Sequence, residues 1–218
     1  YRGIASFYYP LALTSLIGLT IQPMLTFFMG RAPSPLESLA VFPVVHSLSF
    51  IFRALGLSFQ EVGIALMGKD HEHFPELRRF ALTLSVLVAG GLGLVAFTPL
   101  VTVWFEVVSG LTPELAAFAI TPTRIIVIFP ALTVLISLER AILVTGKRTG
   151  PITWATAVEV LTIAILFPVF GWGVGMIGVT AAFLAAVLGR LGSTAFLAVP
   201  SRRMLSRSSE RAPDPPGP

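Results

Sequence analysis

The sequence predicts an all-α membrane protein built as a bundle of six transmembrane helices. The first observation is the composition: 55% of the 218 residues are hydrophobic and 12% are charged, with a mean hydropathy of +0.86. So little polar surface cannot coat a soluble domain, and the surrounding solvent must be mostly lipid. The second is that six apolar stretches reach the roughly 20 residues that a spanning helix needs. The third is that Lys and Arg gather in every second gap between these stretches.

The apolar stretches define the expected helices and their order. A helix satisfies its own backbone hydrogen bonds, which lets an apolar run cross hydrocarbon. The predicted spans are residues 7–29, 39–67, 80–105, 115–144, 152–170 and 174–199. Residues 1–199 then form one transmembrane lobe, and residues 200–218, rich in Ser, Arg and Pro, form a disordered cytoplasmic tail.

The first span contains polar residues on one face and two prolines. Thr14, Gly18 and Gln22 recur every four residues, so they share one side of the helix. Pro10 and Pro23 interrupt the backbone hydrogen bonds, and we expect this helix to bend.

The second span carries the richest stripe of polar and small residues. Its members recur at spacings of three and four, with Glu61 slightly to one side; they are His46, Ser49, Arg53, Gly56, Gln60 and Gly63. Arg53 lies near the middle of the span, where a charge is costly. Two roles stay open for it: a structural arginine bonded to carbonyls or to a carboxylate of another helix, or part of a solute pathway.

The later spans hold the remaining buried charges. Arg124 lies near the outer end of the fourth span, and Glu139 and Arg140 lie near its inner end, so we expect interfacial positions and structural ion pairs there. Glu159 and Arg190 lie at similar depths in the fifth and sixth spans. Because these spans are successive and antiparallel, we expect Glu159 to pair with Arg190.

Positive charge in the gaps predicts the orientation. The even gaps and the two ends hold ten Lys or Arg residues, whereas the odd gaps hold only Arg31. Positive residues resist translocation and accumulate on the cytoplasmic side. We therefore expect both termini in the cytoplasm, in an inner (plasma) membrane. The pI of about 10.1 then reflects contact with anionic lipid, and no nucleic-acid partner is expected.

Several kinds of site are excluded or disfavoured. The chain has no cysteine, so it has no disulfide, thiolate metal site or cysteine nucleophile. His71 and His73 lie in the charged loop after the second span, and the flanking charges favour a solvated loop over a metal site. No HExxH, phosphate loop or other catalytic spacing is present. We expect no metal, no cofactor and no enzymatic activity.

Four segments of the chain match, in order, the motifs of a known membrane protein superfamily. They are YPLAL at 9–13, GR at 30–31 leading to LAVFP at 39–43, RAILVTGKRTGP at 140–151 and GVGMIGVTAA at 173–182. Together they resemble one six-helix half of the MOP flippase superfamily, which includes the multidrug and toxin extrusion (MATE) transporters. FYYPLAL at 7–13, PTRI at 122–125 and FP at 129–130 are similar to the C-terminal half of the progressive ankylosis family.

The resemblance implies a twelve-helix transporter, in which two such halves surround a central cavity and alternate its access. It implies export of small anions such as citrate, nucleotides or pyrophosphate, and it makes Arg53 and Arg124 candidate anion contacts. The polar faces of the first two spans add further candidates for the substrate path: Gln22, His46, Gln60 and Glu61. The acidic residues that some multidrug members use for cation coupling are not clearly matched, so a coupling ion stays open.

The sequence therefore predicts a lobe of a secondary transporter whose partners are the bilayer, a small-molecule substrate and a coupling ion. The chain begins at Tyr1, and we expect either a missing N-terminal half in a longer protein or a second, parallel copy. A lipid-linked oligosaccharide flippase or a multidrug exporter is the alternative within transport. A non-transporting membrane scaffold, whose buried polar residues only join helices, is the alternative of another class.

Overall fold

The chain folds into helices alone. The structure is a computed structural model that describes residues 2–68 and 71–209, and no strand occurs among them. The elements are α1 (Arg2–Leu19), α2 (Ile21–Met29), α3 (Pro35–Leu66), α4 (Phe74–Phe97), α5 (Leu100–Thr102), η2 (Val103–Val108), α6 (Pro113–Ile125), η3 (Ile126–Ile128), α7 (Phe129–Thr145), α8 (Gly150–Phe167), η4 (Pro168–Gly173) and α9 (Gly178–Ser209). The predicted features at Lys69, Arg211 and 210–218 lie outside the described residues.

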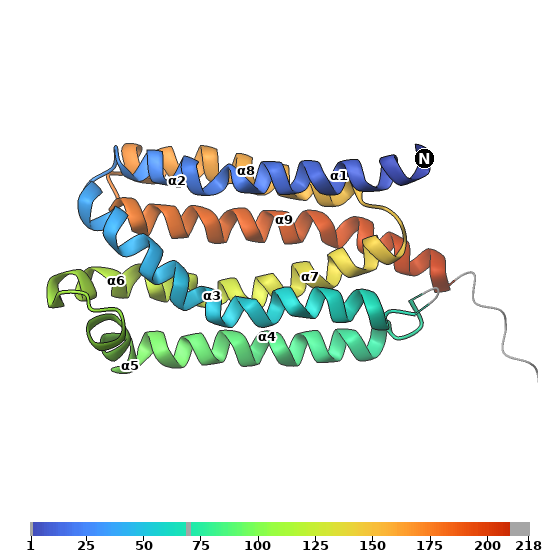
Figure 1. The fold of residues 1–218 in the computed structure, drawn as a ribbon, viewed down its shortest axis with the longest axis horizontal. Coiled ribbons are helices and arrows are strands. Elements are labelled where there is room, and N and C mark those ends of the chain that lie inside the picture. The colour runs from blue at the N-terminus through green and yellow to red at the C-terminus, as the bar shows by residue number, and fades with distance from the viewer. Residues whose placement is uncertain (1, 69–70, 210–218) are drawn as a thin grey trace, which may run out of the picture.

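Six helical segments of the described chain are long and apolar enough to cross a membrane. They are Leu11–Met29, Pro35–Leu66, Phe74–Phe97, Pro113–Thr145, Gly150–Gly173 and Gly178–Ser206. This confirms the prediction of an all-α chain with six spans, as expected of an integral membrane protein. The segments run along one long axis, and the two ends of the described chain lie at the same end of the bundle (Figure 1).

Helices α7 and α9 occupy the middle of the bundle. Helix α7 contacts α3, α4 and α9, and α9 also packs along α8. Helix α1 packs mainly on α8 at one side, and α4 lies at the opposite side (Figure 1). Of the six segments, Pro113–Thr145 is the most buried and Leu11–Met29 the least. The α1–α2 span therefore covers one side of a core that the later helices supply.

Prolines interrupt two of the spans. Pro23 has no N–H for the carbonyl four residues earlier, and the first span divides into α1 and α2 at Thr20. The helix is interrupted near Pro23, whereas α1 stays helical through Pro10. Pro130 leaves the Ile126 carbonyl without its α-helical partner in the same way, and the 3₁₀ segment η3 separates α6 from α7 there.

The third span differs from its predicted range of 80–105. Helix α4 begins earlier, at Phe74, and ends at Phe97. The chain then turns, because Thr98 is extended and Pro99 starts a new short helix instead of prolonging the old one. The apolar residues after Pro99 belong to α5 and the π-helix η2, which apolar composition alone could not separate from the span.

The sixth span also extends past its predicted end at residue 199. Helix α9 continues through Pro200 to Ser209, so the first ten residues of the predicted tail are helical. A proline removes only its own backbone hydrogen bond. The Ser201 hydroxyl in the same turn donates to the Leu197 carbonyl at 2.9 Å, so this polar side chain is satisfied within the helix.

The loop between α3 and α4 is fastened to the bundle rather than fully solvated. His71 is buried, and its Nε2–H donates to the Ile142 carbonyl of α7 at 3.1 Å. Its backbone lies in the left-handed region, with φ of 65°. The prediction of a solvated loop is therefore wrong for His71, because a backbone carbonyl of α7 is within its reach.

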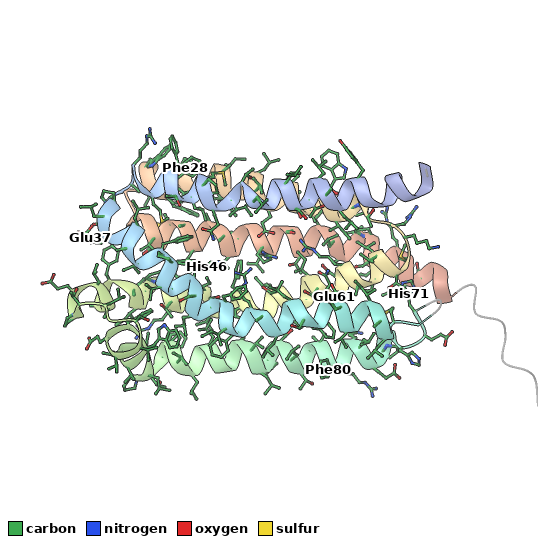
Figure 2. All side chains as sticks on the ribbon, in the orientation of Figure 1. Phe28, Glu37, His46, Glu61, His71 and Phe80 are labelled. Atoms are coloured by element: carbon green, nitrogen blue, oxygen red, sulfur yellow. The ribbon has the colours of Figure 1, made fainter. Side chains whose placement is uncertain are left out.

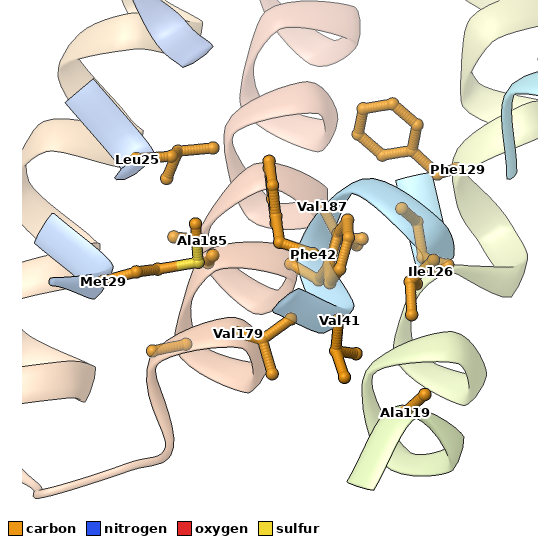
Figure 3. Close-up of a cluster of buried hydrophobic side chains, with 14 of the residues drawn as sticks. Leu25, Met29, Val41, Phe42, Ala119, Ile126, Phe129, Val179, Ala185 and Val187 are labelled. Atoms are coloured by element: carbon orange, nitrogen blue, oxygen red, sulfur yellow. The ribbon is translucent and has the colours of Figure 1, made fainter. Parts of the chain in front are cut away.

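The largest hydrophobic cluster lies toward the end of the bundle that is opposite the chain ends. Residues of α2, α3, α7 and α9 meet in it, among them Leu25, Phe42, Phe129 and Val187 (Figure 3). The rings of Phe42 and Phe183 stack, with centroids 5.1 Å apart. This cluster holds the α1–α2 span against the later helices at that end.

Candidate functional site

A polar cavity lies between the α1–α2 span and helices α3, α7, α8 and α9. Its volume is about 370 Å³, within the range of small-molecule sites. Members of the large hydrophobic cluster form one wall, among them Leu25, Phe42, Phe129 and Phe183. The lining also contains one histidine and four charged residues: His46, Arg53, Arg140, Glu159 and Arg190. A polar space inside membrane-length helices is tolerated where it holds water or solute.

Arg190 and Glu159 form an ion pair in this cavity. Arg190 Nη2 of α9 lies 2.9 Å from Glu159 Oε1 of α8, and both side chains are largely buried. Gly189 permits the close approach, because a Cβ there would lie 3.0 Å from the Glu159 carbonyl oxygen. This is the contact that similar depth on successive spans predicts. The charge of Arg190 balances that of Glu159, so Glu159 does not also balance a second arginine.

Arg53 enters the cavity from α3. Its Nη1–H donates to His46 Nε2 at 3.4 Å, two helical turns away, so Nε2 of that imidazole is unprotonated. The Arg53 guanidinium lies 4.6 Å from the centroid of the Phe129 ring, and the Arg190 guanidinium lies 5.0 Å from the same centroid. The ring attracts both cations and holds two like charges close together.

Arg140 also lines the cavity, which corrects its expected interfacial position. Its Nη2–H donates weakly to Thr156 Oγ1 of α8 at 3.5 Å. Glu139 forms no ion pair with it among the described residues, because consecutive helical side chains point in different directions. Glu139 is half-buried, and its Oε2 has no hydrogen-bond partner in the described part of the chain.

The cavity has an excess of positive charge. Among the described lining residues, three arginines face one glutamate, which leaves two positive charges uncompensated. The Nε–H groups of Arg53, Arg140 and Arg190 are buried without a hydrogen-bond partner in residues 2–68 and 71–209. The arrangement therefore presents unbalanced positive charge to anything that enters the cavity.

The polar stripe of α3 divides between this cavity and a helix contact. His46 and Arg53 line the cavity, but a Cβ on Gly56 or Gly63 would lie 3.0 Å from atoms of α7. Gln60 and Glu61 lie farther along the helix, outside the cavity lining, and Glu61 is exposed (Figure 2). Beyond Arg53, the polar stripe of α3 therefore no longer faces the cavity.

Of two other residues predicted for the substrate path, one lines the cavity and the other lies outside it. Gln22 of α2 lines the cavity. Arg124 lies outside it: this side chain is exposed, its Nε–H donates to the Ala96 carbonyl at 3.5 Å, and its guanidinium lies 5.5 Å from the Phe97 ring centroid. Arg124 thus lies beside the last turn of α4 and not among the cavity arginines.

Sequence reasoning missed Phe129 and Thr156 as cavity residues. Thr156 precedes Glu159 by three residues and so shares its helical face, a signal that could have been used. Phe129 follows the break before Pro130, and no periodicity predicts the direction of a side chain after such a break. We find no protein-family model, curated protein or solved structure that matches this chain.

Proposed function

We propose that this chain is a six-helix lobe of a secondary transporter of MOP-superfamily type, and that its cavity binds a small anion with two or more negative charges. The observation that carries the proposal is the placement of three arginines against one glutamate in a cavity among membrane-length helices. The resemblance of several sequence motifs to that superfamily supports the same function.

Charge balance decides between an anion site and mere helix contacts. A charge at the centre of a membrane helix costs about 2.5–3.5 kcal/mol on insertion scales, and buried charges are normally paired. The Arg190–Glu159 pair meets this rule, but the hydrogen-bond partners of Arg53 and Arg140 among the described residues are a neutral imidazole and a hydroxyl. A dianion would balance the remaining charge, whereas a monoanion such as acetate would balance half of it.

The proposed transport cycle needs a second six-helix half, either in the same protein or from a second parallel copy. In this scheme the two halves rock against each other in an inner membrane with cytoplasmic termini, and the cavity opens to each side in turn. The arginines of this lobe release the anion when the opposite half withdraws. Export of citrate, nucleotides or pyrophosphate fits the charge requirement.

Binding can be measured on the whole chain in neutral detergent. We expect pyrophosphate and citrate to raise the melting temperature saturably, and acetate at equal ionic strength to leave it unchanged. Arg53→Gln removes a buried charged donor, so we expect affinity for pyrophosphate to fall at least tenfold, or about 1.4 kcal/mol. Arg124→Gln is the matched control outside the cavity, with unchanged affinity.

Other outcomes separate the alternatives. A folded Arg53→Gln variant with wild-type pyrophosphate affinity would show that Arg53 does not contact the anion. Absence of binding by all three anions, together with lost assembly in Arg53→Gln, would favour the scaffold. Flux of labelled pyrophosphate into proteoliposomes then tests whether two parallel copies of this chain transport the anion, with Arg53→Gln as the inactive variant.

A further inference from the structure

A second groove is lined by the start of α8 and the late turns of α9. These parts of the two helices lie at the end of the bundle that holds the chain ends (Figure 1). Its volume is about 550 Å³. The first turns of α8 contribute Pro151 and Trp154, and the late turns of α9 contribute Phe196, Val199 and Arg203. None of these residues lines the arginine cavity, so the groove is a separate feature and is independent of the proposed transport.

The wall of this groove is apolar and open to its surroundings. Trp154 is 69% exposed, Val199 52% and Phe196 42%. These residues lie near the ends of the spans Gly150–Gly173 and Gly178–Ser206, which places them at the depth where a bilayer passes from hydrocarbon to headgroups. An indole at that depth typically contacts both regions. The wall suits an acyl chain near its headgroup.

The polar end of the groove is positive. Arg203 lies one helical turn beyond Val199, is exposed, and its side chain makes no hydrogen bond or ion pair with the described residues. The first turn of α8, which begins at Gly150 beside it, contains no acidic residue, so the positive end of that helix dipole is not neutralised locally. Arg203 is available for this purpose only because α9 continues through Pro200.

We propose that this groove binds one anionic phospholipid. Its phosphate contacts the Arg203 guanidinium, and its acyl chain lies along Trp154, Phe196 and Val199. A zwitterionic phospholipid offers the same chain, but its own ammonium or choline group offsets the phosphate charge that Arg203 recognises. The apolar wall fits an acyl chain, and the Arg203 cation fits a phosphate. A lipid offers both groups, whereas a soluble anion offers only the charge.

Quenching of Trp154 reports the acyl chain directly. The whole chain, in neutral detergent, is titrated at low mole fraction with phosphatidylglycerol or phosphatidylcholine that carry the same brominated chains. The chain has three tryptophans, and the difference between wild type and Trp154→Phe isolates Trp154 from Trp104 and Trp172. We expect quenching of Trp154 to require about fivefold less phosphatidylglycerol than phosphatidylcholine.

Two variants assign that preference to the charge. Arg203→Gln should abolish the fivefold difference, whereas Arg79→Gln, an exposed arginine of α4 near the same end of the bundle, should retain it. Equal quenching by both lipids in the wild type would overturn the proposal. So would an undiminished preference in Arg203→Gln. Circular dichroism of each variant confirms that it remains folded.

Discussion

Two stretches of α3, one up to Arg53 and one from Gly56 onward, meet the rest of the bundle in opposite ways. In the first stretch, His46 and Arg53 face the cavity, and the Arg53 guanidinium lies 4.6 Å from the centroid of the Phe129 ring. In the second stretch, Gly56 and Gly63 bring α3 directly against α7, with a hydrophobic cluster alongside. One stripe of three- and four-residue spacing thus produces both a site and a contact. Side-chain size decides which, because small residues let backbones approach and long polar ones keep space open.

The largest effect should come from breaking the Arg190–Glu159 pair in the cavity that the first stretch of α3 faces. Arg190→Leu leaves the Glu159 carboxylate buried with no cation in contact, so we expect a loss of about 3–5 kcal/mol in the free energy of unfolding and a lower yield. Thermal and chemical unfolding in mild detergent measure the change.

The double variant Arg190→Leu with Glu159→Leu separates pairing from packing. It removes both charges and should recover most of the lost stability. A single Arg190→Leu variant as stable as the wild type would mean that the 2.9 Å pair contributes nothing to folding.

The stretch of α3 that contacts α7 is tested by enlarging Gly56. A Cβ at this position would lie 3.0 Å from Val134 Cγ2 and 3.1 Å from its backbone nitrogen, and a backbone atom cannot rotate away. We expect Gly56→Leu to force α3 from α7 and to lower the free energy of unfolding by about 1–3 kcal/mol or more. Unfolding in the same detergent measures it.

Gly90 provides the control for this substitution. It lies in α4, is exposed, and a Cβ there would meet no atom within 4 Å. Gly90→Leu should therefore leave stability unchanged or raise it slightly, since leucine favours a helix more than glycine does. Equal losses in both variants would show that the close approach of α3 to α7 is not the cause of the loss in Gly56→Leu.

The comparison also explains which features could be predicted from sequence. Composition and length suffice for six spans, because lipid leaves an apolar chain few alternatives to helices. The positions of Glu159 and Arg190 along two neighbouring spans suffice to predict their ion pair, because antiparallel neighbours place residues of equal depth side by side. In each case the relevant quantity is a position along one axis, which the sequence carries.

The features that the sequence did not predict depend on how each helix is rotated about its own axis and on where each helix ends. Arg140 faces the cavity and Gln60 does not, because inter-helix packing decides which face of a helix points inward. The helical start of the predicted tail was missed for a related reason: Ser and Arg are tolerated in a helix that already exists, and Pro200 interrupts only one bond. Neighbouring helices and existing turns supply this information, which a linear pattern lacks.

The smallest expected effect concerns the second uncompensated arginine. Thr156→Val keeps the shape of the side chain but removes the oxygen that accepts from Arg140 Nη2 at 3.5 Å. Thr162→Val, six residues along α8, loses the same kind of bond to a carbonyl four residues earlier without involving an arginine. The difference between the two variants therefore isolates the contact with Arg140.

We expect Thr156→Val to be less stable than Thr162→Val by about 0.5 kcal/mol, because a long hydrogen bond between partly buried groups contributes little. If Arg140 is held for an anion, the same variant should weaken pyrophosphate binding while Thr162→Val does not. A stability difference without any change in binding would assign Arg140 to the helix contacts and leave Arg53 and Arg190 as the anion contacts. The cavity would then hold one uncompensated charge for its ligand instead of two, and acetate would compete with pyrophosphate.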